Sequence, residues 1–94
     1  MTVINPEDVK RNLEEWLQNE SWKFVYDHAP SDACREYIAK MFYASETEED
    51  EAFDAMDDAE RKLSAEDLKY MMKVIAGPDK ARLARRIEAL EGST

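Results

Sequence analysis

Glycine, cysteine and histidine are scarce in this 94-residue chain, and each scarcity excludes a class of site. There are two glycines, and the first of them is Gly77. A phosphate-binding loop, a dinucleotide-binding fingerprint and an EF-hand each need glycine at fixed positions, so none of them lies before Gly77. The single cysteine, Cys34, cannot form an internal disulfide and gives no sign of an oxidising compartment. One histidine and one cysteine cannot supply the usual zinc ligand sets.

Long apolar runs are absent as well. No run approaches the roughly 20 residues that cross a bilayer. Residues 1–6 lack the basic start and the long apolar stretch of a signal peptide. Apolar residues still make up 44% of the chain, which is too rich for a disordered sequence. We therefore expect a folded, cytoplasmic protein with no membrane contact, forming a single domain over residues 1–94.

Capping and helix-breaking residues divide the chain into five or six short helices. Each expected helix begins at a polar side chain that can accept from free N–H groups, or at a proline that suits the first turn. The expected starts are Asn5 with Pro6, Ser21, Ser31 or Asp32, Thr47, Ser64, and Pro78 after a left-handed cap at Gly77. Because apolar residues recur at helical spacing between these starts, the sequence predicts an all-α, single-domain bundle. The first helix is expected at about residues 6–19.

The stretch 22–26 is the one place where a strand competes with a helix, because it combines β-propensity with partial alternation. We prefer a helix, since an isolated strand would leave its backbone groups unpaired. This helix carries apolar residues on more than one face, which predicts burial on several sides. Most aromatic side chains, including Trp16 and Trp22, are expected in the core. Phe24 and Tyr70 are the candidates for an apolar contact with a partner.

The net charge of −9 is concentrated in one stretch. Residues 46–60 hold nine acids and no base, whereas residues 61–94 hold five acids and eight bases. This pattern predicts an acidic helix at about 48–62, with Phe53 and the other apolar residues on its core side. The candidate binding residues of its acidic face are Glu46, Glu49, Asp50, Asp54, Asp57 and Asp58.

Charge density suggests what this face could bind. Fifteen helical residues span about 22 Å, so nine acids give roughly one charge per 2.5 Å, against about 1.7 Å for duplex DNA. Such a face could occupy a basic, nucleic-acid-binding surface of a partner by electrostatic complementarity. The alternative is a face that only keeps the protein in solution.

The C-terminal helix, expected at about 78–91, has the opposite charge. Its candidate basic residues are Lys80, Arg82, Arg85 and Arg86. With the preceding helix it suggests a helix-turn-helix that could enter a DNA groove, although the overall negative charge opposes affinity for DNA. We expect these bases to pair with the acidic helix instead, within the chain or across a dimer.

His28 and Cys34 form the one conventional base and nucleophile pair. A helix start can lower the pKa of a thiol such as Cys34. However, Cys34 also begins the apolar stripe of its own helix, and free cysteine is among the most buried residue types. We therefore expect no catalytic residue, no metal site and no cofactor.

The sequence thus predicts a non-enzymatic protein-binding protein, an inhibitor or adaptor that docks an acidic helix on a basic partner surface. Small phage-encoded antagonists of host nucleic-acid machinery, including anti-CRISPR proteins, often have this size and charge, an analogy with no motif behind it. The alternatives are a DNA-binding regulator that uses the C-terminal helix pair and a structural homo-oligomer.

Overall fold

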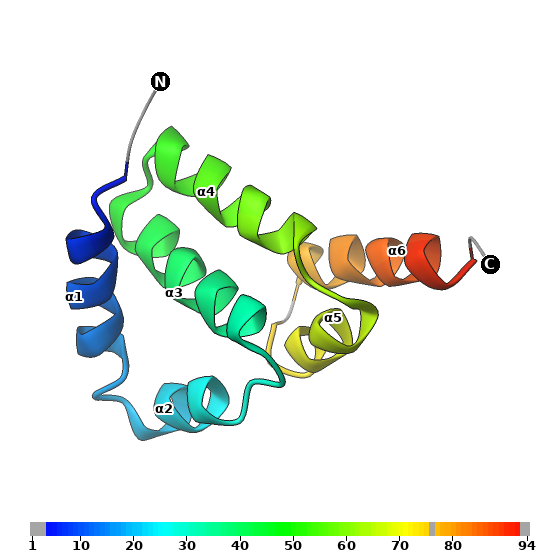
Figure 1. Ribbon diagram of the computed structural model, residues 1–94, viewed down its shortest axis with the longest axis horizontal. Helices are drawn as coiled ribbons and strands as arrows, with labels where there is room; N and C mark the ends of the chain where they lie inside the picture. Colours follow the sequence, from blue (N-terminus) through cyan, green and yellow to red (C-terminus); the bar gives the residue numbers. More distant parts are fainter. Residues whose placement is uncertain (1–3, 76, 93–94) are drawn as a thin grey trace. The chain divides into compact units, whose positions relative to one another are not determined.

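The computed structural model describes residues 4–75 and 77–92, and within these ranges it contains six α-helices and no strand (Figure 1). The helices are α1 (Pro6–Trp16), α2 (Glu20–Asp27), α3 (Asp32–Thr47), α4 (Asp50–Arg61), α5 (Ala65–Met72) and α6 (Pro78–Gly92). The all-α prediction is confirmed, and the stretch 22–26 is helical. The chain divides into two compact units, Met1–Lys62 with α1 to α4 and Leu63–Thr94 with α5 and α6. A single domain over the whole chain stays a prediction.

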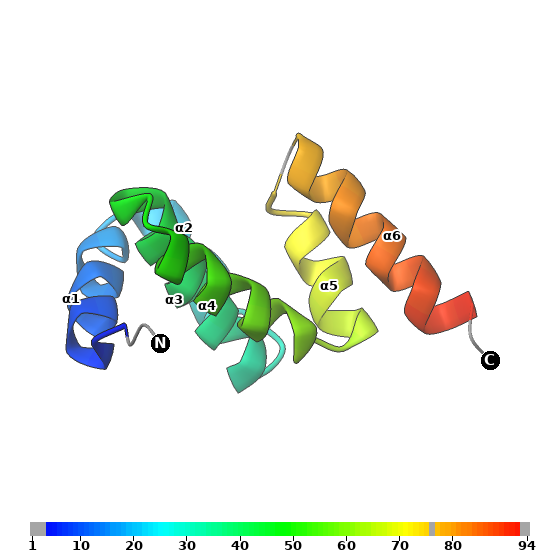
Figure 2. The same cartoon turned by 90° about the horizontal axis from the view of Figure 1, so that it is seen from above.

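Helix α3 is the centre of the first unit. It packs against α1 and against α4, and it lies between them (Figures 1 and 2). Most of its buried residues recur at helical spacing from Cys34, as the predicted apolar stripe requires, but Met41, which has the same spacing, is half-buried. They are Cys34, Tyr37, Ile38, Ala39, Phe42 and Ala44.

Trp16 of α1 and Trp22 of α2 meet Phe42 of α3 in an aromatic cluster. The rings of Trp16 and Phe42 stack with centroids 4.4 Å apart and an interplanar angle of 9°. The ring of Trp22 meets Phe42 edge-on at 5.1 Å and Trp16 at 6.0 Å. Stacked and edge-to-face pairs are both favourable for aromatic rings. The cluster attaches α2 to the unit, although no residue within α2 is itself fully buried.

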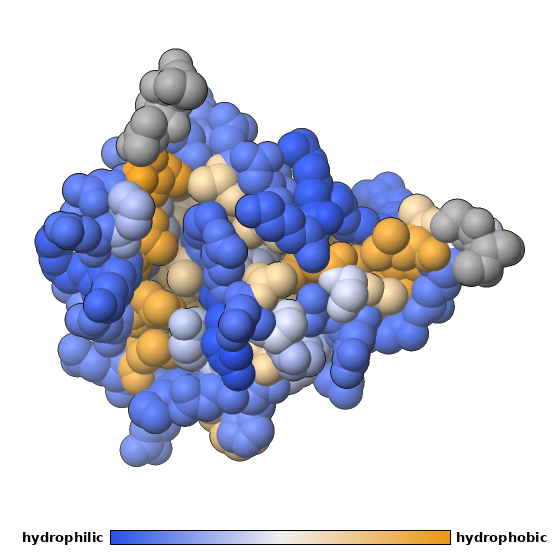
Figure 3. Space-filling view, viewed as in Figure 1, coloured by the Kyte–Doolittle hydropathy of each residue, from blue (hydrophilic) through white to orange (hydrophobic). Residues whose placement is uncertain are grey.

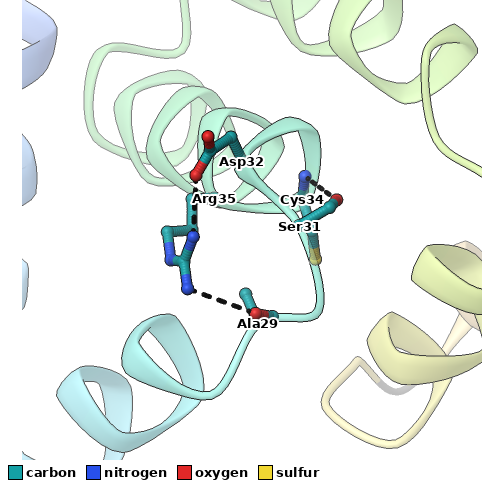
Figure 4. A network of polar contacts seen from close by, with 5 residues as sticks. All are labelled: Ala29, Ser31, Asp32, Cys34 and Arg35. Carbon is teal, nitrogen blue, oxygen red and sulfur yellow. Dashed lines mark hydrogen bonds and ion pairs between the residues drawn. The ribbon is translucent and has the colours of Figure 1, made fainter.

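Polar contacts at the start of α3 fix the turn that follows Pro30 (Figure 4). The Ser31 hydroxyl accepts a hydrogen bond from the backbone N–H of Cys34 at 3.1 Å, which confirms Ser31 as one of the two expected caps. Arg35 donates to the Asp32 carboxylate at 2.8 Å and to the carbonyl oxygen of Ala29 at 3.4 Å. Arg35 therefore ties the first turn of α3 to the segment before it.

The boundary between the first two helices differs from the prediction. Helix α1 ends at Trp16 rather than near residue 19, and α2 is capped by Asn19 rather than by Ser21. The Asn19 side-chain oxygen accepts from the N–H groups of Ser21 at 2.9 Å and Trp22 at 3.4 Å. Because asparagine caps at least as well as serine, the earlier of the two residues starts the helix.

The second unit is a pair of helices, α5 and α6, that pack against each other (Figure 2). Ser64 and Asp67 form the predicted capping box, with side-chain to backbone distances of 3.2 and 3.1 Å. Helix α6 begins at Pro78 as predicted, directly after Gly77, whose φ of +83° is left-handed. Helix α5 already ends at Met72, so the expectation that Gly77 ends it is wrong.

Candidate interaction surface

The turn between α3 and α4 moves the start of the acidic helix. Helix α3 continues to Thr47, whose hydroxyl donates to the carbonyl oxygen of Tyr43 at 2.9 Å. Glu48 then adopts a left-handed conformation with φ of +55°, and α4 follows from Asp50, with Glu49 as an N-cap that makes no side-chain cap bond. The prediction that Thr47 caps a helix beginning near residue 48 is therefore wrong.

This boundary separates Glu46 from the acidic helix. Glu46 lies on α3, whereas Asp50, Asp54 and Asp57 lie on α4. The prediction that Glu46 belongs to the acidic face of the same helix as these aspartates is therefore wrong. Asp50, Asp54 and Asp57 follow one another at steps of four and three residues along α4, so they share one helical face.

The predicted core position of Phe53 is also wrong, because 41% of its surface is exposed. Helix α4 instead buries Ala52 and Ala59, which are 1% and 2% exposed. Small side chains such as these, with Ala44 buried on α3, allow two helices to approach closely. Phe53 follows Ala52 by about 100° around the helix axis, so it lies at the edge of the acidic face.

We define the acidic surface as eight exposed or half-buried carboxylates at the end of α3, in the turn and along α4. They are Glu46, Glu48, Glu49, Asp50, Glu51, Asp54, Asp57 and Asp58. Within the described part of the chain, Asp58 is the only one of the eight with an ion-pair partner, Arg61 at 2.9 Å. The ninth acid of the stretch, Glu60, is buried at 3% exposed. In the space-filling view, hydrophilic residues dominate over α4 (Figure 3).

Glu36 and Tyr43 of α3 have pKa values that are shifted by opposite environments. Burial raises the pKa of Tyr43, and the negative charges of Asp8 and Glu49 raise it further. The hydrogen bond from Lys40 lowers the pKa of Glu36, against a smaller opposing effect of burial. The negative charges of Asp8 and Glu49 therefore act on the half-buried Tyr43, whereas the charge of Glu36 is balanced by Lys40.

The linear charge density is lower than the sequence predicts. Helix α4 has 12 residues, which corresponds to about 18 Å. The five carboxylates of the acidic surface that lie on α4 give about one charge per 3.6 Å, roughly half the density of duplex DNA. The density falls because the stretch 46–60 is not one helix and because Glu60 is buried.

The predicted basic residues lie along α6. Lys80 and Arg85 are exposed, whereas Arg82 and Arg86 are half-buried. Arg82 pairs with Asp79 of the same helix at 3.3 Å. Pairing of these bases with the acidic helix, within the chain or across a dimer, stays a prediction.

The two candidate apolar contact residues differ in exposure. Phe24 is 62% exposed and stacks on the ring of His28, with centroids 4.0 Å apart, so the expected burial of α2 on several sides is wrong. Tyr70, on α5, is half-buried. Contact of either residue with a partner stays a prediction.

His28 and Cys34 occupy different environments. His28 is exposed, and its Nδ1 lies 2.9 Å from the carbonyl oxygen of Phe24. Cys34 has no exposed surface. Among the described residues, no group of three or more His, Cys, Asp or Glu could hold a metal ion, and none of the described helices is long and apolar enough to span a membrane.

Sequence reasoning missed one surface feature of the first unit. A shallow depression of about 320 Å³ is lined by Glu15, Trp16, Asn19 and Trp22. Both tryptophans are half-buried rather than enclosed in the core as predicted. An apolar stripe does not reveal which edge of a large ring stays exposed, so the sequence carries no clear signal for this depression.

Comparison of the chain with protein-family models, with curated proteins and with solved structures finds no match. Any proposal for its function therefore depends on the charges and the exposed aromatic rings of the described surface.

Proposed function

We propose that this protein is a non-enzymatic binding protein, an inhibitor or adaptor that docks its acidic surface on a basic surface of a partner protein. The observation that carries the proposal is that seven of its eight carboxylates have no ion-pair partner within the described residues. Like charges at i and i+4, such as Asp50 with Asp54, destabilise a helix by a few tenths of a kcal/mol per pair. Lysine or arginine side chains of a partner would remove this repulsion.

Phe53 adds an apolar element to the same surface. Its exposed ring lies one helical turn from Glu49, Asp50 and Asp57. Aromatic residues are enriched at protein interfaces, where they fill pockets while the surrounding charges set orientation. An aromatic ring among carboxylates fits a basic partner surface that contains an apolar pocket.

The spacing of the charges favours a protein surface with separated basic side chains over full imitation of a duplex, because the charge density of α4 is about half that of DNA. A protein that covers only part of a nucleic-acid-binding surface still inhibits the partner when its binding site overlaps that of the nucleic acid. A phage-type antagonist, such as an anti-CRISPR protein, is the form of this function that small size and net charge favour.

Charge reversal within the acidic surface tests the proposal. Asp50→Lys, Asp54→Lys and Asp57→Lys are combined in one variant, and Glu14→Lys, Glu20→Lys and Glu88→Lys are combined in a control with the same change in net charge. The control residues are exposed and have no ion-pair partner among the described residues. Each protein is immobilised and used to capture partners from the native host at low and at high salt.

We expect the wild type and the control to retain the same partner at low salt and release it at high salt, and we expect the acidic-surface variant to retain none. We also expect excess duplex DNA to release the partner if its basic surface binds nucleic acid. Circular dichroism establishes that both variants remain helical. Retention of the partner by a folded acidic-surface variant would contradict the proposal.

A further inference from the structure

The depression at the junction of α1 and α2 has a composition suited to one kind of ligand. Two indole rings and one carboxylate, from Trp16, Trp22 and Glu15, line it together with Asn19. Both tryptophans are half-buried, so part of each indole is open to solvent. The depression is shallow, so it fits the end of a side chain rather than an enclosed small molecule.

The lining is held in place before any ligand arrives. Trp16 stacks on the buried Phe42 at 4.4 Å, and Trp22 meets the same ring edge-on at 5.1 Å. Asn19 is fixed because its side-chain oxygen caps α2. Preorganised groups lose little conformational entropy on binding, so these rings can act as a platform without rearrangement.

The charge of the lining selects a cation. Glu15 is exposed, and within residues 4–75 and 77–92 it has no ion-pair partner. The electron-rich face of tryptophan attracts cations more strongly than that of any other aromatic side chain. A guanidinium group can stack on such a ring and also form two parallel hydrogen bonds with a carboxylate, which the ammonium group of lysine cannot do.

We infer that this depression binds the guanidinium group of an arginine side chain presented by a partner protein. The negative charge of the chain, −9 overall, favours a basic protein as the source of that arginine. The site uses residues of α1, α2 and the segment between them, whereas the acidic surface uses the end of α3, the turn and α4. The two surfaces share no residue, so variants of one leave the other intact and either proposal can be disproved without the other.

The tryptophans make the experiment direct, because the only two in the chain both line the depression. The full chain is titrated with the capped peptide acetyl-Gly-Arg-Gly-amide, and the two indole N–H signals are followed by NMR. The same peptide with citrulline, the uncharged isostere of arginine, and one with lysine serve as ligand controls. Glu15→Gln is the test variant. Glu14→Gln, an exposed neighbour outside the lining, is the matched protein control.

We expect the arginine peptide to shift both indole signals saturably, and the citrulline and lysine peptides to bind at least about fivefold more weakly. We expect Glu15→Gln to weaken arginine binding by about fivefold and Glu14→Gln to change it by less than about twofold. Both variants change exposed residues without altering length or helix propensity, so their folding is secure. Absence of a saturable shift, equal binding of citrulline or lysine, or unchanged binding by Glu15→Gln would each overturn the inference.

Discussion

Helices α3 and α4 are neighbours that use their side chains in opposite ways. Helix α3 buries large residues such as Tyr37 and Phe42, each 1% exposed, and pairs Asp32 and Glu36 with bases one turn away. Helix α4 buries chiefly alanine, leaves Phe53 exposed, and carries the larger part of the acidic surface. Apart from Glu46 at its end, the acids of α3 have ion-pair partners, whereas four of the five acidic-surface carboxylates on α4 have none among the described residues.

This difference indicates what each helix is for. The packing of α3 and its ion pairs at Asp32 and Glu36 contribute to stability. Asp50 and Glu51 lie in the first turn of α4, where acids favour the helix. However, Asp54 and Asp57 lie further along and have no ion-pair partner among the described residues, which is why we propose a partner for this surface. Variants of α3, of α4 and of residues near them test this difference between the two helices.

The largest difference is expected between two identical truncations. Phe42→Ala on α3 removes a buried ring that contacts both tryptophans, and we expect a loss of about 3–5 kcal/mol in the free energy of unfolding. Phe53→Ala on α4 removes a ring that is 41% exposed, and we expect a loss below about 1 kcal/mol. Urea denaturation measures both values. Equal losses would remove the distinction between the two helices.

A buried polar side chain of α1 offers a second test. Asn12 of α1 is 9% exposed, and its Nδ2 atom has no hydrogen-bond partner among the described residues. Because an unsatisfied buried amide is costly, we expect Asn12→Leu to stabilise the protein by about 1 kcal/mol or more. The same change at the cap, Asn19→Leu, should instead destabilise it by about 1 kcal/mol. Melting temperatures that change in the same direction for both variants would contradict the conclusion that the buried amide of Asn12 is costly whereas that of Asn19 stabilises a helix as its cap.

The left-handed residue between the two helices provides a third test. Glu48, with φ of +55°, adopts a conformation that costs a residue with a side chain about 1 kcal/mol relative to glycine. We expect Glu48→Gly to stabilise the protein by up to this amount, while Glu48→Ala leaves the strain in place. Chemical denaturation compares the two variants. If glycine brings no gain over alanine, the turn is not strained.

The smallest effect concerns the balanced charges of α3. The hydrogen bond from Lys40, at 2.6 Å, lowers the pKa of Glu36, so this pair adds stability above the ordinary carboxyl pKa and loses it as the pH falls through the lowered value. Because Glu36 is half-exposed, we expect Glu36→Gln to cost only about 0.3–0.5 kcal/mol at neutral pH and nothing near about pH 2. Denaturant titrations at the two pH values measure this difference.

Asp54→Asn on α4 is the matched control for that pair. Asp54 has no ion-pair partner within the described residues, so we expect no loss at neutral pH, and a small gain from reduced repulsion. A loss as large as that of Glu36→Gln would show that α4 uses its charges for stability in the same way as α3.

Local chemistry explains which parts of the fold the sequence predicts. The cap at Ser31, the capping box at Ser64 and the start at Pro78 depend on residues within one turn, and all three are confirmed. The sequence predicts Ser21 rather than Asn19 as the cap of α2 because two capping residues stand close together, and local propensity does not choose between them.

Tertiary packing explains what the sequence does not predict. The apolar pattern of α4 places Phe53 on the core side, but contact through Ala52 and Ala59 turns it outward. Glu48 ends α3 in a left-handed conformation that glycine usually adopts. Because no glycine marks this turn, the sequence predicts a longer acidic helix than the structure contains. The depression at Trp16 and Trp22 depends on three helices meeting at Phe42, which no single periodicity reveals.

The most direct test of the account is the salt dependence of partner binding, measured by titration of the purified partner at several salt concentrations. We predict that affinity for the wild type falls steeply as salt rises, because separated charges are screened. For the variant with Asp50→Lys, Asp54→Lys and Asp57→Lys, we predict binding that is at least about tenfold weaker at low salt. Equal affinity and an equal salt slope for the two proteins would contradict the claim that the acidic surface serves recognition.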